Sequence, residues 1–268
     1  MTTRNIEQRF WRSPLVPWIE WRSTVQSTQA YKLHQHPQLS IGAIIDGETV
    51  TRCSGHEYHL SQGDMVLIAP REAHSCNPAA ERPRSYHMLY LDEAWCLQQL
   101  GFAPGEHLHC AQTVLRNPSF FTAFMHIISL MEDNQTGELQ EAVRALLVSL
   151  PGLQTAVKPA EFCNHIQTTL LADIQQPPSL DCLAQRYTLR KETLIRQFKL
   201  ATGLTPGAWI NNARVEFAKA QLRAGSDIAD AGYQSGFADQ SHFHRTFVSF
   251  TSSTPRQYAQ GRSISDNN

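Results

Sequence analysis

The sequence predicts two domains: an antiparallel β-barrel with two C-terminal helices, followed by an all-α domain with two helix-turn-helix motifs joined by a long helix. Three observations lead to this fold class. A chain of 268 residues, 41% of them hydrophobic, exceeds the usual size of one domain. Short β-prone runs fill the first third, and helical periodicity fills the rest. Near the C-terminus one helical pattern occurs twice.

The barrel is predicted from the rhythm of strands and turns. From Tyr31 to about Tyr90, runs such as "LSIGAIIDG" and "DMVLIAP" are cut by glycine and proline about every ten residues, which is typical of an antiparallel sandwich or barrel. Between Asn117 and Leu150, apolar residues recur three and four apart, which predicts two helices with a break near residues 134–137. These segments make up the first expected domain, residues 1–150.

The second domain is predicted from the repeat. Residues 151–160, "PGLQTAVKPA", are typical of a linker, and residues 161–262 show helical patterns only. The two copies of the repeat are "SLDCLAQRYTLRKETLIRQFKLATGLTP" (about 179–206) and "SDIADAGYQSGFADQSHFHRTFVSFTSSTP" (about 226–255). Each copy holds a short helix, a turn, a second helix with arginine two residues before phenylalanine, and then Thr-Pro. This is the helix-turn-helix layout. A long helix, about Pro206 to Leu222, joins the copies.

The second helix of each copy has an apolar stripe and a polar face. Leu194 with Phe198, and Phe243 with Phe247, stand four residues apart and are expected to seat the helices. The remaining positions carry donors and acceptors of the kind that read base edges and grip phosphates, although each one alone could simply face solvent. The predicted DNA-binding residues are Arg190, Lys191, Glu192, Ile195, Arg196, Lys199, Gln240, Ser241, His242, His244 and Arg245.

The pair His242 and His244 looks like a chelating motif but is not predicted to be one. On a helix the two side chains lie about 200° apart, so they cannot bind one ion. We expect His244, beside Arg245, to touch DNA, and His242 to border the groove.

These residues resemble the AraC/XylS family of bacterial transcription regulators. The similar segments are "LAQRYTLRKETLIRQFKLATGLTPGAWI", "ARVEFAKAQLRAGSDIA" and "GFADQSHFHRTF". The resemblance implies a seven-helix domain with two helix-turn-helix units that bends promoter DNA and recruits or blocks RNA polymerase. The chain departs from the family at Val248, where lysine is usual, and at Ser252, where glycine is usual. The first change is expected to remove a phosphate contact, and the second to alter a helix end.

The barrel carries a second histidine pair, His34 and His36, whose side chains would point to the same side of a strand. His74 could join them, because "GDMVLIAPREAHSCNP" resembles the second motif of the cupin fold, with Gly63 and Pro70. Metal-binding cupins add a glutamate where this chain has Ser40 or Ile41. The resemblance therefore implies a cupin-like barrel that binds a small-molecule effector, with no metal or cofactor expected. The predicted effector pocket comprises His34, His36, His74, Arg71, Glu72 and Tyr90, and only its three histidines could hold a metal. They could also be ordinary hydrogen-bonding barrel residues.

Two functions from different classes remain. The first is an effector-controlled regulator that binds double-stranded promoter DNA, acts on RNA polymerase and forms a homodimer through the helices near residues 118–150; packing of these helices on their own barrel is the alternative. The second is a cupin metalloenzyme with a helical appendage, which explains the histidines but leaves the repeated motif without a purpose. We therefore expect a regulator and not an enzyme.

Composition limits the other possibilities. The six cysteines form no C-x-x-C pair, which argues against a zinc ribbon or a disulfide scaffold. No apolar run reaches the roughly 18 to 20 residues that cross a bilayer, and the N-terminus lacks an apolar signal-peptide core, so no membrane partner and a cytoplasmic location are expected. The net charge is −1, but residues 160–265 hold 11 Lys and Arg against eight Asp and Glu, which is compatible with a polyanionic partner.

Overall fold

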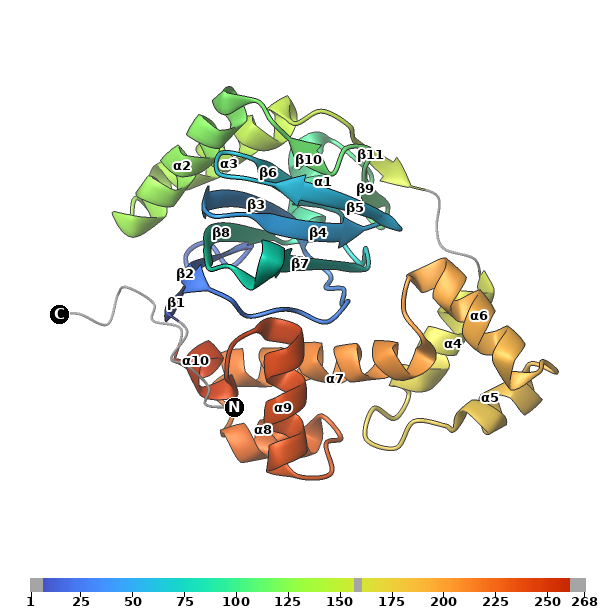
Figure 1. The fold of residues 1–268 in the computed structure, drawn as a ribbon. Helices are drawn as coiled ribbons and strands as arrows, with labels where there is room; N and C mark the ends of the chain where they lie inside the picture. The colour runs from blue at the N-terminus through green and yellow to red at the C-terminus, as the bar shows by residue number, and fades with distance from the viewer. Residues whose placement is uncertain (1–6, 157–160, 261–268) are drawn as a thin grey trace.

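The computed structural model describes residues 7–156 and 161–260. The N-terminal part is a β-barrel, and the C-terminal part is helical, as predicted (Figure 1). The strands of the barrel part are β1 Glu7–Trp11, β2 Ile19–Ser27, β3 Leu39–Asp46, β4 Thr49–Cys53, β5 His56–Leu60, β6 Met65–Ile68, β7 His74–Pro78, β8 Arg84–Leu91, β9 His107–Cys110, β10 Val114–Leu115 and β11 Leu153–Ala156.

All strand pairs are antiparallel. A six-stranded sheet has the order β1-β2-β8-β3-β6-β10, a three-stranded sheet has the order β5-β4-β7, and β9 pairs with β11. The faces of the two larger sheets enclose an apolar interior that includes Ile44, Leu60, Ile68 and Met88. Met88 packs closely against Gly42 in that interior, because a Cβ at position 42 would lie 2.7 Å from the Met88 Cε.

Three α-helices accompany the described barrel, α1 Glu93–Leu100, α2 Pro118–Glu132 and α3 Thr136–Ser149, together with the short 3-10 helix η1 Ala79–Glu81. The predicted pair is confirmed as α2 and α3, with the break at Asn134, whose φ of 54° lies in the left-handed region. The apolar stripes of both helices are buried against the barrel in one core with β2, β3 and β8. Packing on their own barrel therefore accounts for the inner faces of these helices.

The predicted linker was wrong in its first part. Residues 153–156 form β11, which pairs with β9 along its whole length, so this segment belongs to the barrel part of the fold. Periodicity could not show this, because a four-residue edge strand leaves almost no pattern and its partner lies more than 40 residues away. Residues 157–160 lie outside the described part of the chain.

The described C-terminal part contains the seven helices that the resemblance implied. They are α4 Glu161–Leu171, α5 Leu180–Arg186, α6 Lys191–Thr202, α7 Pro206–Arg223, α8 Ile228–Gln234, α9 Gln240–Thr251 and α10 Pro255–Ala259. The long helix α7 runs beneath the barrel and separates a unit of α4–α6 from a unit of α8–α10 (Figure 1). Each unit has its own apolar core, built around Phe198 in the first and Phe247 in the second.

The barrel contributes a residue to each of these cores. Phe10 of β1 joins the second core and lies edge-on to Tyr258, with ring centroids 5.2 Å apart. Ala73 joins the first core and meets the end of α6 at Gly203, where a Cβ would lie 2.4 Å from the Ala73 Cβ. Both helix-turn-helix units are thus docked on the barrel.

Candidate functional site

Each copy of the repeat forms a helix-turn-helix, and its Thr-Pro starts the next helix. Thr205 and Thr254 cap α7 and α10 by accepting a hydrogen bond from a backbone amide of the first turn. The proline that follows each threonine occupies the first turn of the helix, where its missing N–H costs nothing. The repeated dipeptide therefore ends one unit and begins the next helix.

In the first unit, α6 has the predicted division into two faces. Leu194 and Phe198 are fully buried. Among the predicted DNA-binding residues of this unit, Lys191 is paired with Asp181 through a 2.8 Å contact, and Ile195 is half-buried. The exposed ones are Arg190, Glu192, Arg196 and Lys199.

In the second unit, α8 and α9 cross closely. Gly232 of α8 lies against Phe243 of α9, and a Cβ on it would come within 2.8 Å of the ring. From the sequence alone, Gly232 only lowers the helix propensity of α8. The structure shows that the close contact with Phe243 requires a residue without a side chain at this position. Asp239 caps α9 by accepting from the His242 amide at 2.7 Å. Phe243 and Phe247 are buried, as predicted.

The exposed face of α9 carries Gln240, Ser241, His244 and Arg245. His242 differs from them, because its ring is half-buried and packs edge-on against Phe237, with centroids 5.3 Å apart. The helix therefore separates the two histidines as expected, with one facing solvent beside Arg245 and the other packed against the turn.

The two departures from the family pattern lie at the far end of α9. Ser252 ends the helix in the left-handed region, with a φ of 53°, where glycine is favoured. Its backbone carbonyl accepts a hydrogen bond from the Gln8 Nε2 at 2.9 Å. Val248 is half-buried on the same helix. The C-terminal end of α9 thus faces the barrel, whereas Gln240 and Ser241 at its N-terminal end are exposed to solvent.

The barrel histidines do converge, although the strand assigned to two of them was wrong. His34 and His36 belong to an irregular segment before β3, and His34 pairs with His74 of β7 through one isolated bridge. Two reciprocal backbone hydrogen bonds of 3.0 and 2.8 Å hold His34 and His74 together. One ring nitrogen of each of the three histidines lies within 4.8 Å of the others. Within the described residues, this is the one group of at least three His, Cys, Asp or Glu side chains with such spacing.

Burial keeps these histidines neutral. Desolvation lowers the pKa of His74 to about 4. Desolvation, together with repulsion from His74, holds the pKa values of His34 and His36 well below their ordinary value near 6.5. Neutral imidazoles can donate one hydrogen bond and offer one lone pair. The cluster is therefore suited to polar ligands and to metal ions.

The cavity beside the histidines differs in part from the predicted pocket. Tyr90 lines it, edge-on to His36 at 5.4 Å, as predicted. Arg71 and Glu72 do not line it: Arg71 forms an ion pair with Glu93, and Glu72 accepts from the Ser54 hydroxyl at 2.8 Å. Both residues border another groove. Arg71 and Glu72 are close to His74 in sequence, but they lie outside the histidine cavity. The backbone changes direction at Arg71, where φ is 60°.

Sequence reasoning missed Arg22 and Tyr31. Both line the space between the barrel and α7, together with His34 and His36. Arg22 is 3% exposed, lies over the rings of Phe10, Tyr31 and Tyr86, and its Nε and Nη2 have no hydrogen-bond partner among the described residues. An arginine in the middle of the apolar strand "IEWRSTV" was the available signal, because a buried guanidinium needs a partner or a ligand.

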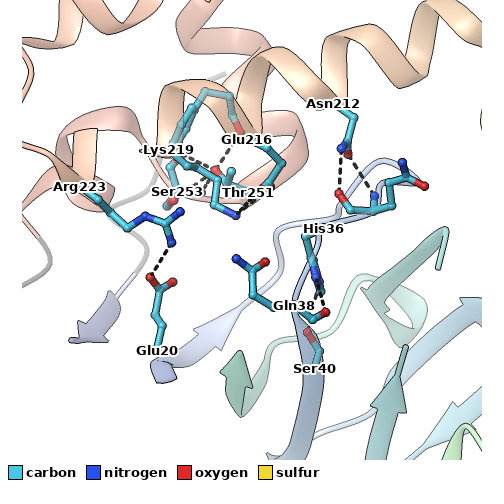
Figure 2. Close-up of polar contacts among 12 residues, drawn as sticks. Glu20, His36, Gln38, Ser40, Asn212, Glu216, Lys219, Arg223, Thr251 and Ser253 are labelled. Atoms are coloured by element: carbon cyan, nitrogen blue, oxygen red, sulfur yellow. Dashed lines mark hydrogen bonds and ion pairs between the residues drawn. The ribbon is translucent and has the colours of Figure 1, made fainter. Parts of the chain in front are cut away.

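The histidine segment also contacts the helical domain. Gln35, between His34 and His36, donates its backbone N–H to the Asn212 Oδ1 at 3.0 Å and accepts from the Asn212 Nδ2 at 2.8 Å. Figure 2 shows Asn212 of α7 above this segment, with His36 turned toward the Gln38 carbonyl and Ser40. Nearby, Arg223 of α7 pairs with Glu20 of β2 at 3.6 Å. One short segment thus carries cavity residues and an interdomain contact in alternation.

A wider groove of about 1180 Å³ separates the barrel from α6. The hairpin of β4 and β5, with Arg71 and Glu72, forms one wall, and Arg196 and Lys199 stand on the other. Two of the predicted DNA-binding residues of the first unit therefore face the barrel. The predicted residues of α9 border none of these grooves.

Comparisons with known proteins agree with this architecture. The family model for the AraC-like ligand binding domain matches residues 19–150, and a helix-turn-helix domain model matches residues 183–261. The chain belongs to the AraC family of DNA-binding transcriptional regulators. It is 27% identical over 224 residues to the uncharacterized HTH-type transcriptional regulator YbfI of Bacillus subtilis, covering 80% of this chain and 82% of that protein. It is 25% identical over 254 residues to the HTH-type transcriptional activator RhaS of Salmonella heidelberg, covering 87% and 89%.

Solved structures share the two-domain fold. ToxT from Vibrio cholerae with a bound unsaturated fatty acid superimposes with a TM-score of 0.58 at 14% identity, covering 97% of this chain and 96% of ToxT. As an AraC-type regulator, this protein combines a DNA-binding domain with an N-terminal ligand-binding domain. In the part of the chain that the structure describes, no helix is long and apolar enough to cross a membrane.

Proposed function

We propose that this AraC-type regulator reads double-stranded promoter DNA with the exposed faces of α6 and α9, and that an effector in the histidine cavity controls this reading. The alternation along residues 34–36 carries the proposal, since the two histidines line the cavity while Gln35 is bound to α7. A ligand that moves the histidines must also strain or release the contact with Asn212. Such a ligand favours one domain arrangement in proportion to its difference in affinity for the two arrangements.

In this domain arrangement, the cavity that the three histidines and the barrel interior line has a volume of only about 30 Å³. That volume holds a water molecule or an ion but not an organic effector. Binding of a larger effector therefore requires the segment of His34 to His36 to move, which couples binding to the contact with α7. The ToxT structure with a bound fatty acid supports the idea that this fold admits a small-molecule ligand.

The DNA contacts are proposed to be unequal in the two units. The predicted residues of α9 are open to solvent, whereas Arg196 and Lys199 of α6 border the groove that faces the barrel. Reading by α6 would then require the groove to widen. This gives the effector a physical means of control, because a shift of the barrel would expose the first recognition helix.

A binding experiment tests the role of α9. A duplex selected from a random library by the wild-type protein would be titrated with wild type and with Arg245→Ala at several salt concentrations. If Arg245 contacts a base, the variant loses about 1–3 kcal/mol of affinity for the selected duplex; if it contacts a phosphate, the salt dependence falls by about one charge. Arg82→Ala, which alters an exposed arginine just before β8, is the matched control. Equal binding by wild type and Arg245→Ala would overturn the proposed reading face.

The remaining partners are part of the same proposal. Regulation through RNA polymerase follows from the role of the family, and a regulator of transcription acts where the chromosome lies, which retains the cytoplasmic location expected from the sequence. A homodimer through the outer faces of α2 and α3 is supported by Val148 of α3, which is 59% exposed, and by a surface groove of about 590 Å³ that Ala123 of α2 and Ala142 of α3 line. Sedimentation of the full chain at several concentrations would detect the homodimer.

In this proposal the protein has no catalytic role, as its named relatives are transcriptional regulators.

A further inference from the structure

The three barrel histidines share one tautomer. The Nδ1 of His34 lies 2.8 Å from the Lys32 carbonyl, that of His74 lies 2.8 Å from the Glu72 carbonyl, and that of His36 lies 3.1 Å from the Gln38 carbonyl. A carbonyl oxygen only accepts hydrogen bonds, so each Nδ1 must carry the proton. Each Nε2 is therefore left with a lone pair.

This arrangement is the one that metal-ligating histidines adopt. Such residues donate one ring N–H to a carbonyl or carboxylate, which fixes the tautomer and directs the other nitrogen at the ion. Here three separate carbonyls do so, while the ring centroids lie 4.4, 4.9 and 6.0 Å apart. The Ser40 hydroxyl, 3.2 Å from the His36 Nε2, is the sole described side chain hydrogen-bonded to any of the three Nε2 atoms. Converging lone pairs favour a cation at their centre.

We propose that His34, His36 and His74 hold a divalent transition-metal ion through their three Nε2 atoms, with an open coordination position toward the space between the barrel and α7. A nitrogen–metal distance of about 2.0–2.1 Å places tetrahedral nitrogens about 3.3 Å apart. In the structure one ring nitrogen of each of the three histidines lies within 4.8 Å of the others, so the rings must draw closer when they bind an ion. The inference rests on the proposed function, because it identifies the cavity of the effector with this centre.

The ligand set indicates the class of ion. Three imidazoles without a carboxylate or thiolate suit Zn²⁺, Ni²⁺, Co²⁺ or Fe²⁺, whereas Mg²⁺ and Ca²⁺ require oxygen ligands. Ser40 replaces the carboxylate that would otherwise bring a negative charge, so the ion retains its full double charge and an open position. This departs from the absence of metal expected from the sequence.

The surrounding charge makes an anion the natural companion of the ion. The buried guanidinium of Arg22 faces the same space, and its Nε and Nη2 have no partner among the described residues. Glu20 is paired with Arg12 at 2.6 Å, and Glu216 with Lys219 at 2.8 Å. A dication is repelled by a guanidinium that no described carboxylate neutralises, unless an anion joins them. The effector class is therefore an anion with a carboxylate or similar oxygen donor that binds the metal and Arg22 together.

Metal binding can be measured on the full chain without a histidine tag. Chelator-stripped protein would be titrated with Co²⁺, and the visible absorption bands and the X-ray absorption fine structure recorded. One ion per chain is expected, bound by three imidazole nitrogens. His36→Gln should weaken binding more than about 100-fold, because even the loss of an outer partner of a ligand costs 10–100-fold. His56→Gln, which alters an exposed histidine of β5 outside the cavity, should bind as wild type does.

The outcomes separate this inference from the proposed function. Lack of stoichiometric binding, or binding that persists in His36→Gln, overturns the metal centre, and neither result affects the DNA titration with Arg245→Ala. X-ray absorption of the wild type decides the matter even if His36→Gln fails to fold. Acetate added to the Co²⁺ form tests the anion: its effect on the visible bands should be lost in Arg22→Met, and no effect in the wild type would overturn the companion role of Arg22.

Discussion

At the scale of single residues, the barrel interior holds polar groups that burial perturbs. His87 of β8 illustrates this away from the histidine cluster. Its Nδ1 accepts a hydrogen bond from the Trp21 Nε1 at 3.3 Å, which requires the neutral ring. Desolvation lowers the pKa of His87 to about 4. The native ring therefore binds its proton less readily than the unfolded chain does.

The pH dependence of stability follows from that shift. Because the folded pKa lies below the unfolded value near 6.5, the unfolded state takes up more protons between about pH 6.5 and 4, and stability falls as the pH is lowered through that window. One such group changes the free energy of unfolding by at most about 1.4 kcal/mol per pH unit. The change is smaller for His87 because its ring is only half-buried.

Urea unfolding at pH 7.0, 5.5 and 4.5 measures this effect. In His87→Gln the loss of stability at acid pH should be smaller than in the wild type, while His56→Gln, at an exposed position, should retain the wild-type pH profile. An unchanged slope in His87→Gln would show that other groups govern the acid limb.

At the scale of elements, the crossing of α8 and α9 depends on one glycine. An alanine methyl at position 232 would lie 2.8 Å from the Phe243 ring, so the helices must separate or the ring must turn. Overpacking of this kind costs about 1–3 kcal/mol, against a gain of about 1 kcal/mol in helix propensity. We expect Gly232→Ala to lower stability by about 1 kcal/mol and to weaken DNA binding by displacing α9.

Gly207→Ala provides the matched comparison. Gly207 also lies in a helix, α7, and a Cβ there meets nothing within 4 Å. This variant should raise the thermal midpoint through propensity alone. If both substitutions stabilise the protein in calorimetry, the close crossing does not limit the second unit.

At the scale of the whole molecule, the contact between Gln35 and Asn212 fastens the long helix to the barrel. Both groups are buried, and removal of the amide leaves the Gln35 N–H and C=O without their partner. An unsatisfied buried polar group costs about 1–3 kcal/mol. Asn212→Ala should therefore loosen the docking of the two domains.

Hydrogen exchange at the Gln35 amide reports on this contact. Exchange should become about 10-fold faster or more in Asn212→Ala, since 1.4 kcal/mol corresponds to a factor of ten. The neighbouring Asn211→Ala should leave it unchanged. Protection retained in Asn212→Ala would mean that the docking through Phe10 and Ala73 suffices.

The sequence by itself determined the two domains, the repeated helix-turn-helix and the buried stripes of α6 and α9. These follow from periodicity and local chemistry, such as the Thr-Pro caps, so neighbouring residues suffice to show them. Only the tertiary structure decided that β11 belongs to the barrel, that Arg71 and Glu72 turn away from His74, and that Arg22 joins the cavity. Those outcomes depend on the pairing of strands distant in sequence and on the direction of the chain at single residues. The separation of His242 from His244 on one helix and the meeting of His34, His36 and His74 show the difference: the first is local geometry, and the second exists only after the barrel has closed.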